Sequence, residues 1–205
     1  MTAAVKAQRR AALLAARRAV PEGVRDAEAE QLCAHLPEVL DGARVVCAYV
    51  PVGAEPGSAA MVERLHELCE TVLLPVAGVG PSGEHLPLRW GRYVPGSLVA
   101  ARFGLQEPPG PWLPPEDVRR AEVVLVPALA VDRFGVRLGR GGGFYDRSLR
   151  LCRTGTRMVA VVRDCELVDE LPHEPHDVRM THALTPAAGC VRLREWDGGD
   201  SGSST

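Results

Sequence analysis

The sequence lacks several features that would assign it to large classes of protein. None of its apolar runs approaches the roughly 20 residues that a membrane-spanning helix needs. Its six cysteines include no C-x-x-C pair, which disfavours a redox motif or a zinc ribbon. Neither charge dominates, because 24 Lys and Arg stand against 26 Asp and Glu, and this excludes a globally basic nucleic-acid binder. Aromatic residues make up only 4%, so few side chains are available to stack on a bound ring: Phe134, Tyr49, Trp90, Tyr93 and Phe144.

The scattered cysteines lie mostly in apolar or helical runs, which predicts reduced, mostly buried thiols in a cytoplasmic protein. A catalytic thiol is the alternative. Residues 1–20 carry five basic and no acidic side chains, a composition also found in mitochondrial presequences. The same segment fits a structural helix, because Lys6, Arg10, Leu13 and Arg17 would lie on one of its faces.

The length of 205 residues and the 46% of hydrophobic residues predict one folded domain, residues 1–195, with a sizeable core. Residues 196–205 have no apolar anchor and are predicted to be a disordered tail. We expect a monomer that acts on small molecules, without a nucleic-acid or membrane partner.

Helix and strand patterns alternate along the chain, and several strands are apolar on both faces. This predicts a three-layer α/β/α fold, Rossmann-like, with a mainly parallel central sheet. Its ligand should lie at the carboxyl ends of the strands, where the loops after Val50, Val131 and Val162 would converge. The expected helices cover 4–19, 25–40, a segment from Ser58 to 69, and 144–152; the expected strands cover 44–50, 71–76, 86–90, 121–132 and 157–162.

The segment RLGRGGGFYDR, from Arg137 to Arg147, interleaves glycine with arginine and follows a buried strand. Glycine lets backbone N–H groups approach a ligand closely, and arginine presents a fork of donors that fits phosphate. A P-loop is excluded because no Lys-Ser/Thr follows the glycines, and the G-x-G-x-G spacing is not that of a dinucleotide fingerprint. The composition therefore predicts a polyphosphate site, with a flexible surface loop as the alternative.

Four distant pieces of the chain together resemble the 5-formyltetrahydrofolate cyclo-ligase family. They are Lys6 with Arg10, AYVPVGAEPGS around Glu55, VPALAVDRFGVRLGRGGGFYDR, and LPHEPHDVRMTHALTP around Asp177. FGLQEP, residues 103–108, also resembles a family segment. The resemblance extends from Lys6 to about Thr185, and its most specific part is the glycine-rich block.

The resemblance implies ATP-driven conversion of 5-formyltetrahydrofolate to 5,10-methenyltetrahydrofolate, with release of ADP and phosphate. The formyl oxygen would attack the γ-phosphoryl group of ATP, and N10 would then close the ring. Arg140 would be the catalytic residue, Mg²⁺ would be held by Asp146 and Asp177, and Val50, Glu55, Arg140 and Phe144 would bind the folate. The implied ATP-binding residues are Lys6, Arg10, Arg137, Leu138, Gly139, Arg140, Gly141, Gly142, Gly143, Phe144 and Tyr145.

Other interpretations stay open at this point. Lys6, Arg10 and Arg17 could form a solvated basic face, Glu55 could be an ordinary loop acid, and Asp177 could cap a turn. His173 and His176 precede Asp177 in a pattern that could hold zinc, although Pro175 argues against a single helical face. The chain could also be a paralogue that binds ATP with another heterocycle, a non-catalytic regulatory protein, or a phosphosugar isomerase of similar architecture.

Overall fold

The computed structural model describes residues 3–174 and 177–194, and its centre is a seven-stranded sheet. The strand order is β12-β11-β9-β6-β1-β2-β3, and the five inner strands are parallel. Strands β3 and β12 are antiparallel edges. The bounds are β1 (Val45–Cys47), β2 (Thr71–Val76), β3 (Arg89–Arg92), β6 (Val123–Pro127), β9 (Arg157–Val161), β11 (His182–Thr185) and β12 (Gly189–Arg192).

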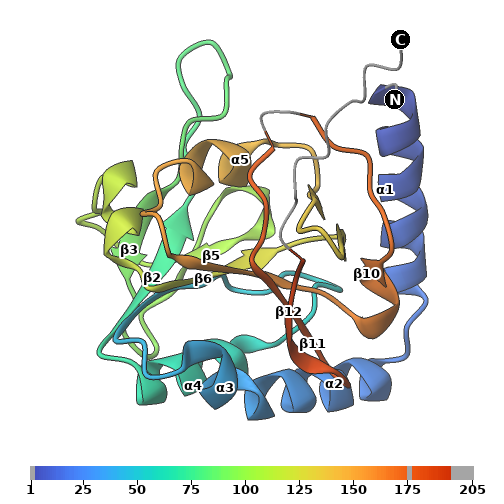
Figure 1. The fold of residues 1–205 in the computed structure, drawn as a ribbon. Helices are drawn as coiled ribbons and strands as arrows, with labels where there is room; N and C mark the ends of the chain where they lie inside the picture. The colour runs from blue at the N-terminus through green and yellow to red at the C-terminus, as the bar shows by residue number, and fades with distance from the viewer. Residues whose placement is uncertain (1–2, 175–176, 195–205) are drawn as a thin grey trace, which may run out of the picture.

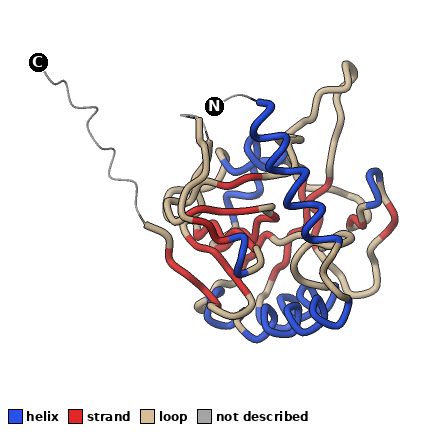
Figure 2. The backbone as a smooth tube through the Cα atoms, turned by 90° about the vertical axis from the view of Figure 1, so that its right-hand side faces the viewer, coloured by secondary structure: helices blue, strands red, loops and turns tan. Residues whose placement is uncertain are grey.

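Helices cover both faces of this sheet, and Figure 1 shows α2, α3 and α4 below it and α5 above it. Helix α1 stands upright at one side (Figure 1), and the view turned by 90° again shows α2 to α4 gathered on one side of the strands (Figure 2). The bounds are α1 (Ala3–Arg18), α2 (Glu22–Ala34), α3 (Leu36–Leu40), α4 (Ala59–Leu68) and α5 (Phe144–Leu149). The three-layer, mainly parallel fold predicted from the sequence is confirmed.

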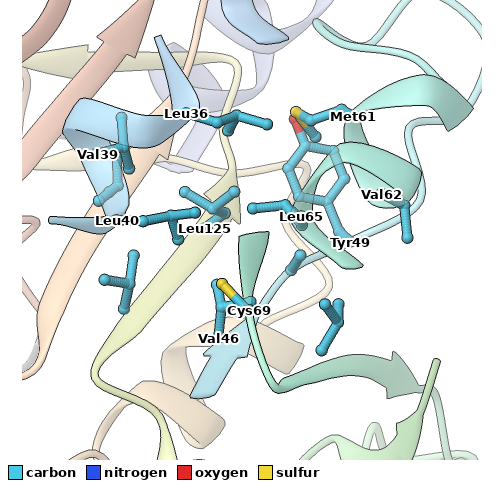
Figure 3. Close-up of a cluster of buried hydrophobic side chains, with 14 of the residues drawn as sticks. Leu36, Val39, Leu40, Val46, Tyr49, Met61, Val62, Leu65, Cys69 and Leu125 are labelled. Carbon is cyan, nitrogen blue, oxygen red and sulfur yellow. The ribbon is translucent and has the colours of Figure 1, made fainter. Parts of the chain in front are cut away.

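Alternating side chains of the strands build a separate core on each face, as the two-residue period of a strand requires. Val46 of β1 lies in the same buried cluster as Leu36 of α3 and Leu65 of α4, and all three are labelled in Figure 3. The next residue, Cys47, lies in the opposite cluster with Leu149 of α5. Burial of both faces explains why these strands are almost entirely apolar.

Two smaller sheets are formed outside the main one. Strands β7 (Ala130–Asp132), β8 (Arg137–Leu138) and β10 (Leu167–Val168) make one, in the order β10-β7-β8. Strands β4 (Val99–Ala100) and β5 (Gln106–Glu107) make the other. Three 3₁₀ segments complete the described chain, at Arg102–Gly104, Pro115–Arg120 and Asp164–Glu166.

Several predicted elements differ from the structure in their bounds. The predicted strand 121–132 is two strands in different sheets, because Pro127 has no N–H to continue the ladder. The predicted helix 25–40 breaks at His35, two residues before Pro37. Ser58 stands at the N-cap of α4, but its side chain makes no capping hydrogen bond. The predicted strand 86–90 is shifted to Arg89–Arg92, and the predicted tail 196–205 lies outside the described residues.

Candidate functional site

A cavity of about 260 Å³ lies at the carboxyl ends of the central strands. The chain runs from β1 to β2 on one side and later to β6 on the other, so the strand order reverses between β1 and β6. Ligands of open α/β sheets bind at such a switch point. The walls come from residues 49–55 after β1, residues 75–77 around the end of β2, residues 105–107, residues 127–129 after β6, and residues 139–146.

The glycine-rich loop, residues 139–143, follows the hairpin of β7 and β8. Buried Asp132 holds the turn of this hairpin, since one oxygen accepts the N–H groups of Phe134 and Val136 and the other accepts that of Leu171. Gly135 has a φ of +82°, and a Cβ there would stand 2.2 Å from the carbonyl oxygen of Met180. Only glycine fits this turn, which sends the chain back over the ends of the strands.

Side chains from two distant segments hold the glycine-rich loop. Arg10 of α1 donates from Nε to the carbonyl oxygen of Gly139 at 2.9 Å. His85, from the long loop between β2 and β3, lies 2.6 Å from the carbonyl oxygen of Gly142 through Nδ1. The His85 ring also stacks on Phe144, with centroids 4.2 Å apart. That long loop projects from the top of the molecule in Figure 1.

Arg140 and Glu55 face each other across the cavity wall. Nε of Arg140 lies 3.3 Å from Oε1 of Glu55, and the Glu55 side chain is only 10% exposed. Oε2 of Glu55 accepts the backbone N–H of Val52 at 3.0 Å, which fixes the carboxylate near the end of β1. The ion pair therefore joins the glycine-rich loop to the segment that follows the first strand of the sheet.

Arg137 and Tyr145 leave polar atoms without partners inside the site. Arg137 donates from Nη2 to Oδ1 of Asp146 at 2.5 Å and from Nη1 to the carbonyl oxygen of Pro127 at 3.3 Å. Its Nε and the hydroxyl of Tyr145 are buried without a hydrogen-bond partner among the described residues. Burial raises the pKa of Tyr145, and nearby Glu55 adds to the rise, so the hydroxyl keeps its proton. Two buried donors without acceptors suit a ligand that carries oxygen atoms.

The two predicted metal ligands differ in where they lie. Asp146 lines the cavity and its side chain is 43% exposed, whereas Asp177 is outside the lining of the cavity. A carboxylate oxygen of Asp177 accepts the backbone N–H of Glu174. Among the described residues, which exclude His176, no three His, Cys, Asp or Glu side chains gather as a metal site would need. Asp146 fits an Mg²⁺ bound with phosphate oxygens and water, which needs only one or two protein carboxylates; the pair Asp146–Asp177 stays a prediction.

Helix α1 is fixed against the site at both of its ends. Lys6 lies 3.3 Å from Glu174, in the segment that also holds Asp177. At the other end, buried Arg17 pairs with both oxygens of buried Glu166 at 2.7 Å and donates to the carbonyl oxygen of Ala128 at 2.5 Å. The basic face predicted for residues 6–17 therefore faces the protein and is not a solvated stripe.

The predicted site residues fall into two groups. Val50, Glu55, Arg137, Gly139, Arg140, Gly141, Gly142, Gly143, Phe144, Tyr145 and Asp146 line one cavity. Lys6, Arg10, Leu138 and Asp177 stand outside its lining, and Leu138 is packed in a small apolar cluster. The loop after Val162, which was expected at the site, does not line the cavity; it supplies Glu166 to Arg17.

Sequence reasoning missed three residues at the site. Arg17 and Glu107 line the cavity, and His85 supports the loop. Arg17 gave a signal, since it lies on the same helical face as Lys6 and Arg10. Glu107 gave a signal as well, since it lies in FGLQEP, the segment that resembles one of the family. His85 occurs in a Gly/Pro-rich segment with no periodic pattern, so its place depends on tertiary contacts alone.

Comparisons with known proteins show the family to which the chain belongs. Residues 2–186 match the model of the 5-formyltetrahydrofolate cyclo-ligase family. A 5-formyltetrahydrofolate cyclo-ligase of Mycolicibacterium smegmatis is 60% identical over 189 residues, which cover 92% of this chain and 97% of the relative. One of Escherichia coli is 31% identical over 75% of this chain and 82% of its own. The solved structure of Aquifex aeolicus 5,10-methenyltetrahydrofolate synthetase has the same fold, with a TM-score of 0.76 and 24% identity over 98% of this chain and 96% of that one. The chain thus belongs to the 5-formyltetrahydrofolate cyclo-ligase family.

Proposed function

We propose that this protein converts 5-formyltetrahydrofolate to 5,10-methenyltetrahydrofolate with hydrolysis of ATP to ADP and phosphate. Membership of the cyclo-ligase family supports the folate substrate and the product. The observation that carries the proposal is the ion pair between Arg140 and Glu55 in the cavity wall. A reaction between ATP and a folate needs the nucleotide segment and the heterocycle segment in contact, and this pair joins them.

The first step is attack of the formyl oxygen on the γ-phosphoryl group, which gives ADP and an imidate-like phosphate ester. N10 then attacks the activated carbon, the C–O bond breaks and phosphate leaves. An amide-type oxygen is a poor leaving group, and phosphorylation makes it a good one. Positioning and neutralisation of charge contribute most to catalysis of such a transfer.

The basic residues of the site suit the polyphosphate. Arg137 has an unpaired Nε, and four of the five residues of the glycine-rich loop are glycines, with no side chain to keep phosphate oxygens from their N–H groups. Arg10 holds this loop through the Gly139 carbonyl, and Lys6 stands one turn away on the same helix. Arg140 is 53% exposed, so its guanidinium is free to turn toward the charge that develops during transfer.

The folate would occupy the part of the cavity between β1 and the glycine-rich loop. Val50 supplies an apolar wall there, and Phe144 offers an aromatic surface. Glu55, fixed by the Val52 N–H, is an acceptor for the N–H donors of the amino-pyrimidine ring.

Mg²⁺, when bound, would neutralise charge on the phosphate oxygens, and Asp146 with Asp177 would hold it. In the structure Asp146 instead pairs with Arg137. Binding of Mg-ATP would therefore exchange this contact for contacts of Arg137 with phosphate and of Asp146 with the metal.

The direct test is to mix purified protein with 5-formyltetrahydrofolate and Mg-ATP and to follow the methenyl-folate chromophore. We expect one ADP and one phosphate for each chromophore formed, and no product without ATP or with the metal chelated. Folded protein that forms no chromophore would exclude the function. Chromophore without ADP would exclude the coupling to phosphoryl transfer.

We also propose that the protein works as a monomer in the cytoplasm. All six cysteines are free, which suits a reducing compartment. Within the described residues, no helix has the length and apolar character needed to cross a membrane. The mitochondrial presequence considered for residues 1–20 is disfavoured by the buried contacts of Arg17, because removal of this segment would leave Glu166 unpaired.

A further inference from the structure

We propose that Glu107 is a second carboxylate for the folate and accepts N–H donors of the reduced pterin that Glu55 does not reach. The inference rests on the proposed folate substrate and deepens it. It follows from the surroundings of Glu107, which differ from those of every other buried acid described in the structure.

Glu107 ends the short strand β5 and reaches the wall of the cavity beside the end of β2. It is 8% exposed. Oε1 accepts the backbone N–H of Ala77 at 2.8 Å, which orients the carboxylate. Among the described residues, Glu107 has no other hydrogen bond and no cationic partner. One carboxylate oxygen is thus held in place while the other is left for the cavity.

The other buried acids are satisfied by the protein. Asp132 accepts three backbone N–H groups, and Glu166 takes both arms of Arg17 with the N–H of Arg163. Glu55, the carboxylate already proposed for the pterin, differs from Glu107 because Arg140 pairs with it. An ionised carboxylate has about four acceptor positions, and the described protein groups fill one of those of Glu107. Its second oxygen is therefore available to a ligand in the cavity.

The charges around the cavity decide which part of the ligand this is. The glycine-rich loop with Arg137 and Arg140 provides the cationic side, where a triphosphate belongs. A carboxylate without a cation repels phosphate, so Glu107 marks a region for a neutral group rich in donors. Leu88, Leu105 and Pro75 line the cavity with it and suit a flat heterocycle. A reduced pterin carries a 2-amino group and two ring N–H groups, and these donors point in different directions, so one carboxylate cannot reach all of them.

Glu107→Gln tests the inference, because the amide carbonyl still accepts the Ala77 N–H while an uncharged NH₂ donor replaces the other oxygen. We expect the KM for 5-formyltetrahydrofolate, and its Kd by calorimetry without ATP, to rise about tenfold or more. The KM for ATP and the half-saturating Mg²⁺ concentration should stay within about twofold of the wild type.

Glu122→Gln is the matched control, since Glu122 also accepts a backbone N–H, that of Arg44 at 2.7 Å, next to the amino end of β6. It should leave both KM values unchanged. If Glu107→Gln does not fold, Glu107→Asp is the second variant. It keeps the charge, but its shorter side chain moves the carboxylate away from the cavity, so the KM for folate alone should rise.

A folded variant with wild-type folate binding, or one in which the KM values for folate and ATP rise together, would overturn the role of Glu107. Failure of the wild-type protein itself to bind 5-formyltetrahydrofolate would instead overturn the proposed function, so the two outcomes are distinct.

Discussion

The buried ion pair of Arg17 and Glu166 is predicted to hold α1, and with it Arg10, against the site. Both side chains are almost fully buried, 2% and 3% exposed, and they are joined by two hydrogen bonds of 2.7 Å. Arg17→Met keeps the length and apolar character of the side chain but leaves the Glu166 carboxylate uncompensated. Removing one partner of such a pair costs about 3–5 kcal/mol of the free energy of unfolding. For a protein of this size, the melting temperature should fall by about 6–20 °C.

The assay is urea unfolding of the wild type, Arg17→Met, Glu166→Gln and the double variant. Because the cost arises from one unpaired charge, the double variant should be more stable than the sum of the single changes predicts. Arg44→Met is the matched control, since Arg44 and Glu70 form the same two-bond pair on the surface, and its unfolding midpoint should stay near the wild type. A loss below about 1 kcal/mol in Arg17→Met would refute the reasoning. In the folded fraction, the KM for ATP should rise, because α1 also carries Arg10.

Three other predictions follow from the site and its thiols. Asp146→Ala should lower kcat/KM by about 10²-fold and raise the Mg²⁺ concentration needed for half-maximal rate, and an unchanged Mg²⁺ dependence would contradict its metal role. Glu55→Gln should raise the KM for the folate more than that for ATP, and equal rises in steady-state kinetics would argue against pterin binding. Burial raises the pKa of Cys69 and Cys152 to about 11, so both stay protonated and poorly reactive at neutral pH. Mass spectrometry after alkylation should find exposed Cys165 modified first with activity retained, and early loss of activity would favour a catalytic thiol.

The fold was predictable because its strands and helices carry strong local signals. Strand β2 has the predicted bounds, 71–76, since its apolar side chains are buried on both faces of the sheet. Helix α1 begins and ends within one residue of its prediction, because Ala, Leu and Arg all favour helix. The break at His35 was missed, since neighbouring helical turns on either side of it present the same apolar pattern.

The site was predictable only in part, for a different physical reason. The glycine-rich loop could be recognised from the sequence, because glycine and arginine rarely alternate in this way. Residues 137–146 do line the cavity, apart from Leu138. Contacts such as Arg140 with Glu55 or His85 with Phe144 join residues far apart in the sequence. Such pairs depend on how the loops pack on the finished sheet, and no local pattern encodes that packing.

The split of the apolar run 121–132 links these two results. A single strand through this run would carry the glycine-rich loop straight away from the sheet and out of reach of Glu55. Because β6 ends at Pro127, the chain leaves the ladder and forms the β7–β8 hairpin, and the N–H of Leu129 donates to the carbonyl oxygen of Leu138. The hairpin returns the loop over the carboxyl ends of β1 and β6. The carbonyl oxygens of Pro127 and Ala128, at the break, accept hydrogen bonds from Arg137 and Arg17. The end of β6 at Pro127, which the predicted strand 121–132 did not include, is therefore the feature that assembles the cavity.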